Sequence, residues 1–325
     1  MKAIKFFAIS AMAAAMITSC SNEDELSQSN YPSDNIIRVT AGVNNAKTRA
    51  EGAGTPLENP LSLTVVNKNV PKYTYVDQEF SKTSGDWACS ETLLWQKSDA
   101  LVDIVAFAPA QTGKFNGVYA NGSIQPIAYS VASDQSTSSA NNDLLYYYAP
   151  GYNPGKSLVD KKLNIQFNHA FCMIDINVTL GTEFNKPEVL KESPIVKVTL
   201  GGTKIAANVN VTNAASVVTI SETDAATDIT TTKGSFDKAA DPEANAKSHF
   251  SCIAIPQTVG ANTFKVSLMT AGKLYEWTSD KEITLQSGYR YTLNLTMGDN
   301  VVLLKGGSIT ANPWGNGEGG PLETD

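Results

Sequence analysis

The sequence predicts an all-β protein whose antiparallel strands pack as a sandwich or a barrel. Short apolar segments recur along most of the 325 residues, many with apolar side chains at every second position. Turn-forming Gly, Asn, Asp and Ser separate these segments, and no stretch has the period of a long amphipathic helix. Because 42% of the residues are hydrophobic, the chain can bury a full core, and its length favours two domains.

The first residues have the composition of an export signal. Lys2 and Lys5 precede the apolar segment Phe6–Ile17, which is too short to cross a bilayer as a helix. Two small residues then precede Cys20, as in the lipoprotein box of bacteria, in which the cysteine is acylated. We therefore predict a signal peptide at residues 1–19 and a lipid anchor on Cys20, which would be the chain's only membrane contact. An ordinary secretory signal with a chance cysteine is the alternative.

Residues 20–35 are polar and aperiodic, which predicts a flexible tether. The acidic run Ser21–Glu25 resembles the signal that sends lipoproteins of Bacteroidetes to the cell surface, although a plain solvated spacer would have the same composition. The net charge of −7, without a cluster of Lys or Arg, excludes nucleic acid as a partner.

The first strand is expected at Ile36–Val43, where apolar and polar residues alternate. Lys47–Ala50 and the Gly- and Pro-rich segment Glu51–Pro60 follow, which predicts an exposed connection open to proteases. We expect cleavage between Arg49 and Ala50, and a solvated basic residue in a linker is the alternative. The strand that such a cut would remove has one apolar face, formed by Ile37, Val39, Ala41 and Val43.

Downstream, strands are expected at each apolar segment between turn residues such as Ser84-Gly85-Asp86. In the first half these are Leu61–Val66, Thr92–Trp95, Leu101–Ala108, Ile124–Val131 and Leu144–Tyr148. In the second half they are Pro194–Leu200, Lys204–Val211, Val217–Ile220, Ser248–Ile255, Phe264–Met269, Lys273–Thr278, Glu282–Leu285 and Tyr289–Thr296. The Thr-, Ala- and Asp-rich stretch Ser221–Lys247 has little apolar content and predicts a long surface loop.

The phase of the alternation changes around Asn168–Met173. Apolar residues occupy odd positions up to Phe167 and even positions from Ile174 to Leu180, and one flat strand cannot serve a single core both ways. A bulge is one explanation, and a crossing from a first sandwich into a second is the other. We place the domains at residues 36–170 and 171–325.

Chemistry-bearing motifs are absent from the sequence. His169 and His249 are far apart and match no metal motif, so both are expected to be structural, and no cofactor is expected. Ser235–Lys238 matches the Ser-x-x-Lys spacing but falls in the low-complexity stretch. The tyrosines Tyr146–Tyr148 either cover a core and its rim or form a platform for sugar rings. We therefore predict a protein that is not an enzyme.

Three cysteines remain once Cys20 carries lipid, and an odd number cannot form a complete disulfide framework. Cys172 and Cys252 lie in apolar strand patterns, where a small buried thiol is the usual explanation. A bridge between these two residues is the alternative in an exported protein.

Five weak motifs, in a fixed order, span nearly the whole chain: Ile17–Cys20, Lys47–Ala50, Asn142–Tyr146, Ile165–Ala170 and Ile309–Gly320. Together they resemble the fimbrillin family of Bacteroidetes, the subunits of type V pili. The resemblance implies two transthyretin-like antiparallel β-sandwich domains in tandem, export to the outer membrane as a lipoprotein, and cleavage at Arg49–Ala50 by an Arg-specific protease.

In that family, removal of the first strand opens a groove that accepts a donor strand from the C-terminal region of a neighbouring subunit. The donor candidate here is Val301–Thr310, with Val301, Leu303 and Ile309 as its apolar residues. The implied function is a structural, adhesive subunit of extracellular fimbriae whose partners are other subunits. A lipid-anchored tip or anchor subunit, or a surface lipoprotein that binds a glycan or a protein, is the alternative.

Overall fold

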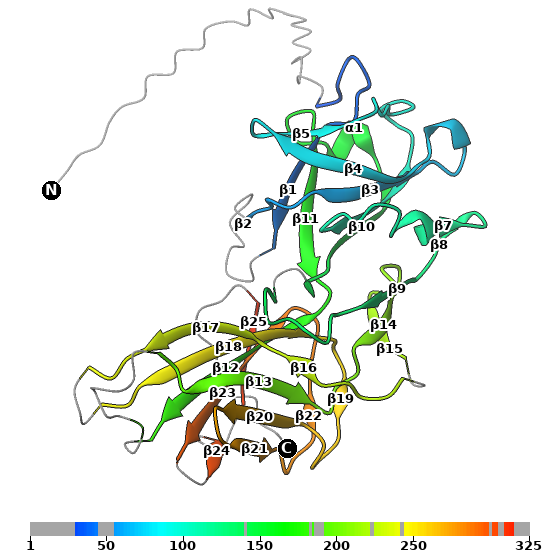
Figure 1. The fold of residues 1–325 in the computed structure, drawn as a ribbon. Helices are drawn as coiled ribbons and strands as arrows, with labels where there is room; N and C mark the ends of the chain where they lie inside the picture. Colours follow the sequence, from blue (N-terminus) through cyan, green and yellow to red (C-terminus); the bar gives the residue numbers. More distant parts are fainter. Residues whose placement is uncertain are drawn as a thin grey trace, which may run out of the picture.

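The computed structural model describes residues 30–44, 55–139, 142–181, 184, 192–221, 224–240, 244–298, 301–304 and 309–314. Nearly every element in this part of the chain is a β-strand, as predicted. Figure 1 shows two lobes, one with β1 to β8, β10 and β11, and one with β9 and the strands from β12 onward. The helical elements described are α1 (Pro154–Ser157) and the 3-10 turns η1 (Pro71–Tyr73) and η2 (Asn116–Val118). None of the described helices is long and apolar enough to cross a membrane.

The first lobe is built on an eight-stranded sheet with the order β2-β1-β11-β10-β6-β3-β4-β5. Its buried side chains form one core, which includes Leu61, Ile104 and Phe167. The bounds are β1 Val39–Val43, β2 Thr55–Pro56, β3 Leu61–Val66, β4 Tyr75–Thr83, β5 Asp86–Cys89, β6 Val102–Ala108, β10 Leu145–Tyr152 and β11 Leu163–His169.

The second lobe contains a six-stranded sheet, β17-β18-β12-β23 with both β24 and β25 on β23, and a four-stranded sheet, β16-β13-β20-β21. Buried side chains of both sheets, such as Ile176 and Leu268, share one core. The bounds are β12 Cys172–Leu180, β13 Ile195–Gly201, β16 Ile229–Thr230, β17 Thr232–Asp237, β18 Lys247–Ala254, β20 Lys265–Thr270, β21 Leu274–Thr278, β23 Tyr289–Met297, β24 Val302–Leu304 and β25 Thr310–Pro313.

The smaller pairings connect these parts. β9 (Ile127–Ser130), from the first half of the sequence, pairs with β14 (Ala206–Val209), which also pairs with β15 (Val218–Ile220). Val131 and Leu144 accordingly belong to the core of the second lobe. The remaining pairs are β7 (Tyr119–Ala120) with β8 (Ser123–Ile124) and β19 (Thr258–Val259) with β22 (Ile283–Thr284).

The change of phase marks the place where the chain leaves the eight-stranded sheet for the six-stranded one. Phe167 is buried on β11 and Ile174 is buried on β12, so each strand turns its own apolar face to a different core. The crossing was one of the two explanations that the alternation left open.

The prediction that all strands are antiparallel was wrong for two pairs. β1 runs parallel to β11, and β12 runs parallel to β23. Partners in these pairs are far apart in the sequence, as in Val39 with Leu163, so long connections bring them side by side in the same direction. Alternation alone does not report strand direction.

One local prediction was also wrong, and one pair of strands was missed. Thr92–Trp95 is not a strand, because only Leu94 forms a single bridge, to Ile36. The hairpin of β4 and β5 was missed, although the turn between them was recognised at Ser84-Gly85. Both turn residues have positive φ angles, of 53° and 95°, as a tight hairpin turn requires.

The stretch Ser221–Lys247 is not simply a surface loop. It contains β16 and β17, and β17 forms an edge of the six-stranded sheet through its pairing with β18. Ile229 is fully buried. β17 was missed because it is the edge strand and exposes most of its side chains, so it carries no apolar alternation.

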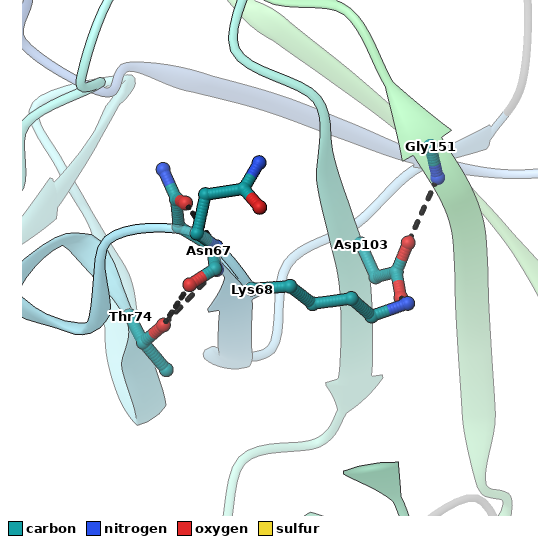
Figure 2. A network of polar contacts seen from close by, with 6 residues as sticks. Asn67, Lys68, Thr74, Asp103 and Gly151 are labelled. Atoms are coloured by element: carbon teal, nitrogen blue, oxygen red, sulfur yellow. Dashed lines mark hydrogen bonds and ion pairs between the residues drawn. The ribbon is translucent and has the colours of Figure 1, made fainter. Parts of the chain in front are cut away.

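A group of polar side chains at the end of β3 in the first lobe has mutual partners, as Figure 2 shows. Asp103, on the otherwise apolar β6, pairs with Lys68 Nζ at 2.6 Å and accepts a hydrogen bond from the Gly151 amide at 2.9 Å. The Asn67 amide donates to Thr74 Oγ1 at 3.0 Å. A carboxylate can stay in this core because both of its oxygens are bonded.

The described cysteines do not form a disulfide. Cys172 and Cys252 are free and buried, and the Cys172 thiol donates to the Ala254 carbonyl at 3.2 Å. Burial raises the pKa of both thiols. The buried-thiol interpretation therefore describes these residues, and the alternative bridge is absent.

Candidate subunit-assembly site

The strand predicted to be removable lies inside the eight-stranded sheet. β1 pairs in parallel with β11 over five positions, from Val39 with Leu163 to Val43 with Phe167, and pairs on its other side with the short β2. Ile37 and Val39 are buried, at 4% and 2% exposure, whereas Ala41 and Val43 are partly buried against the same core. The strand therefore fills a position between two neighbours.

The residues just before β1 bond to a different part of the chain. The Ile37 amide donates to the Leu93 carbonyl at 2.9 Å, and the Trp95 amide donates to the Asn35 carbonyl at 2.8 Å. On the β11 side, the Leu163 amide donates to the Arg38 carbonyl at 2.8 Å. Residues 35–44 thus join the segment after β5 to β11 and close the first lobe.

Side-chain contacts along this segment are polar and exposed. Arg38 pairs with Asp34 at 2.6 Å, and this hydrogen bond lowers the pKa of Asp34 to about 2. At the other end, Asn44 Nδ2 donates to Asn168 Oδ1 at 2.9 Å. Because exposed ion pairs contribute little stability, the buried side chains and the main-chain bonds hold the segment.

The predicted cleavage site belongs to the connection between β1 and β2. Asn44 and Thr55 are the described residues on its two sides, whereas Arg49 and Ala50 lie outside the described residues. Cys20 lies outside them as well. Antiparallel pairing of Gly42 with Pro56 brings the two ends of this connection together.

The described residues of the C-terminal segment, by which we mean residues 301–314, pair with strands of their own subunit. β24 and β25 lie one after the other along the same edge of β23, with Met297 opposite Val302 and Tyr289 opposite Pro313. Val302 and Ile309 are buried, at 6% and 9% exposure, whereas Val301 is 48% exposed. The predicted donor residue Leu303 lies in β24. β23 therefore has β12 on one side and the C-terminal segment on the other.

Three of the motifs found in the sequence meet at the end of this segment. The rings of His169 and Trp314 stack with their centroids 3.9 Å apart and an angle of 3° between the planes. His169 Nδ1 lies 2.8 Å from Asp143 Oδ2, and both side chains are nearly buried. The contact between His169 and Trp314 was missed, because neither residue lies in a pattern that points to the other.

The other sequence candidates do not converge. Tyr146 and Tyr148 pack against one core and Tyr147 against the other, so these tyrosines cover two cores rather than presenting one flat platform. His249 is bonded to Asn177 and Asp237, so both histidines have side-chain partners. Among the described residues, no group of three or more His, Cys, Asp or Glu side chains could hold a metal ion.

A polar groove of about 470 Å³ crosses the outer face of the six-stranded sheet. Asp175 on β12 and Arg290 on β23 form an ion pair inside it, and Asn312 on β25 lines one end. Since Asn312 belongs to the C-terminal segment, that segment forms part of the wall of this groove.

The model of the fimbrillin-like family matches residues 40–314 of the chain, from within β1 to the residue that follows β25. The protein belongs to the fimbrillin-like family. No curated protein matches this fimbrillin-like chain. Most of β1 and all of β24 and β25 lie within the matched region.

Solved structures resemble this fimbrillin-like protein over most of its length. A candidate cell adhesion protein from Bacteroides ovatus is 18% identical, with a TM-score of 0.60 over 86% of this chain and 97% of the other. A candidate cell adhesion protein from Bacteroides uniformis is 14% identical, with a TM-score of 0.56 over 87% and 99%. A fimbrial protein from Bacteroides vulgatus is 14% identical, with a TM-score of 0.51 over 85% and 99%. At these identities the likeness concerns the fold.

Proposed function

We propose that this fimbrillin-like protein is the precursor of a structural subunit of surface fimbriae. It is exported as a lipoprotein anchored at Cys20, cut between Arg49 and Ala50 by an Arg-specific protease, and polymerised by donor-strand exchange. Residues 36–170 and 171–325 form its two transthyretin-like domains. The observation that carries the proposal is the burial of β1 between two strands, directly before a connection that contains the candidate cleavage residues.

The consequence of losing β1 follows from its contacts. Its removal would leave the main chain of β11 without its parallel partner, and would uncover the core that Ile37 and Val39 now fill. An edge of this kind is a template for another strand, because main-chain bonds supply affinity and alternate side chains set the register.

The donor in this proposal is Val301–Thr310 of a neighbouring subunit, with Val301, Leu303 and Ile309 as its candidate apolar residues. The groove and the donor are different surfaces of one subunit. Such a contact is head-to-tail and generates an open filament rather than a closed ring.

In this proposal the precursor resides at the cell outer membrane, where only the lipid touches the bilayer, and the mature subunit is part of an extracellular fimbria. Its partners are other fimbrial subunits, and its role is adhesive and structural rather than enzymatic. Membership of the fimbrillin-like family supports the fimbrial role.

The test is the processing of Arg49→Ala in cells that assemble the fimbriae, with Lys47→Ala as the matched control. We expect Arg49→Ala to accumulate a longer, lipid-bearing chain that forms no filaments, and Lys47→Ala to be processed normally. N-terminal sequencing and intact mass of the surface protein provide the measurement. Normal filaments from Arg49→Ala would refute the proposed cleavage.

The second candidate is a lipid-anchored accessory subunit, at the tip or the anchor, that keeps its first strand. The observation that favours it is the integration of β1 and β25 into the sheets of their own subunit. A mature chain that begins at acylated Cys20 would support this candidate, whereas one that begins at Ala50 would support the polymerising subunit.

A further inference from the structure

Trp314 connects the end of the C-terminal segment to both lobes. Its ring stacks on His169, the last residue of β11 in the first lobe. The Trp314 amide donates a hydrogen bond of 2.6 Å to the carbonyl of Gly288, which lies just before β23 in the second lobe. The Gly288 amide in turn donates to the Phe171 carbonyl at 2.9 Å. Figure 1 shows that the end of β11 points toward β25.

The plane of the imidazole is fixed by Asp143. A carboxylate can only accept, so His169 Nδ1 carries the proton and donates to Asp143 Oδ2 across 2.8 Å. The other oxygen of Asp143 is buried and has no hydrogen-bond partner among the described residues. Among the described residues, His169 is therefore the only hydrogen-bond partner of this carboxylate. This hydrogen bond orients the imidazole ring so that its flat face lies against Trp314.

The rest of the segment is held by smaller contacts. Val302, Ile309 and Ala311 are its described buried hydrophobic side chains, and all three are small or medium in size. β24 pairs with β23 at three positions and β25 at four, and residues 305–308 between them lie outside the described residues. Trp314 is the largest described side chain of residues 301–314 and sits at their end, where a strand frays first.

We propose that His169 and Trp314 form a clamp that retains the C-terminal segment on its own subunit, and that opening this ring stack is the step that frees the segment. This inference rests on the proposed function, because the freed segment contains the proposed donor strand, Val301–Thr310. His169 acts here as a positioning residue, with Asp143 orienting its ring.

The test is amide hydrogen exchange on the full chain, purified in detergent and read by mass spectrometry. In Trp314→Ala, the amides that pair β23 with β25 should exchange about ten- to hundredfold faster than in the wild type, since an aromatic stack and its buried area are lost. Exchange in β6 of the first lobe should not change. Trp314→Phe, which keeps a smaller ring, should lie between the two.

The matched control is His249→Ala, which removes the other hydrogen-bonded histidine from β18 of the same sheet without touching the stack. It should leave the pairing of β23 with β25 unchanged. His169→Ala removes the opposite ring and should reproduce the effect of Trp314→Ala, which covers the case that one of these variants folds poorly. Wild-type exchange in folded Trp314→Ala or His169→Ala protein would overturn the clamp.

Polymerisation of cleaved subunits separates this inference from the proposed function. If the variants open the segment but cleaved protein never forms filaments, the clamp stands and donor-strand exchange fails. If exchange is unchanged and cleaved variants polymerise at the wild-type rate, the clamp fails and the proposed function stands.

Discussion

Shortening the side chain of Val39 to alanine tests whether β1 is held by its buried face. Val39 is 2% exposed and belongs to the core of the first lobe. Val39→Ala removes two methyl groups, each contributing about 0.8 kcal/mol, and the unfilled space that remains adds to this loss. We therefore expect the free energy of unfolding to fall by about 2 kcal/mol, measured by urea denaturation with circular dichroism.

The neighbouring residue provides the control. Thr40 points to the opposite face and is exposed, with one long hydrogen bond of 3.3 Å to Asn164. Thr40→Ala should change the free energy of unfolding by less than about 0.5 kcal/mol. Equal losses in the two variants would refute the reasoning, because they would mean that burial does not hold β1 in the sheet.

Three further predictions concern the interior and its polar contacts. Tyr291→Phe removes the hydroxyl that accepts a hydrogen bond from the Gln286 amide and donates one to the Thr284 carbonyl. The free energy of unfolding, measured by urea denaturation, should fall by about 1–3 kcal/mol. The Asp103 carboxylate raises the pKa of Lys68 above its ordinary value of 10.5. The stability that this ion pair contributes should therefore be fully present below pH 10.5 and lost as the pH rises through the raised pKa of Lys68. Alkylation of the native protein at pH 8 should modify the half-buried Cys89 and spare the buried Cys172, as read by peptide mass spectrometry.

Each of these predictions has an outcome that would contradict it. Wild-type stability of Tyr291→Phe would mean that the hydroxyl bonds do not contribute. A Lys68→Gln variant that loses stability between pH 10 and 12 as steeply as the wild type would refute the linkage. Labelling of Cys172 before global unfolding would show that its strand opens locally.

The strands with one fully apolar face could be predicted from the sequence, because burial of one face requires an apolar residue at every second position. Leu61–Val66 has the predicted bounds, and the change of phase before Ile174 marks the passage between two sheets. β4 could not be predicted in this way. Phe80 is its one buried residue, and the strand is interrupted at Asp77, whose φ of 52° accompanies a shift in register.

The sequence predicts the individual strands and residues of the candidate site, but not which of them are in contact. The alternation around Val39 predicts a half-buried strand, but nothing local indicates that its partner is β11 or that the two run in parallel. His169 was expected to be structural and Trp314 to be an anchor near the terminus, yet their stack depends on how the two lobes meet. Such contacts join residues separated by more than a hundred positions, which a local pattern does not encode.

The parallel pairing of β1 with β11 also determines when β1 can be added during folding. Thr40 and its partner Asn164 are separated by 124 positions, so β1 cannot pair with β11 until residues 163–167 are available, and until then its described pairing in the sheet is the short one with β2. The hairpins of β3 with β4 and of β4 with β5 need only local closure, and contacts of this kind form first. The pairing of β1 with β11 therefore forms after these hairpins, and its loss leaves the pairings of β3 with β4 and of β4 with β5 in place.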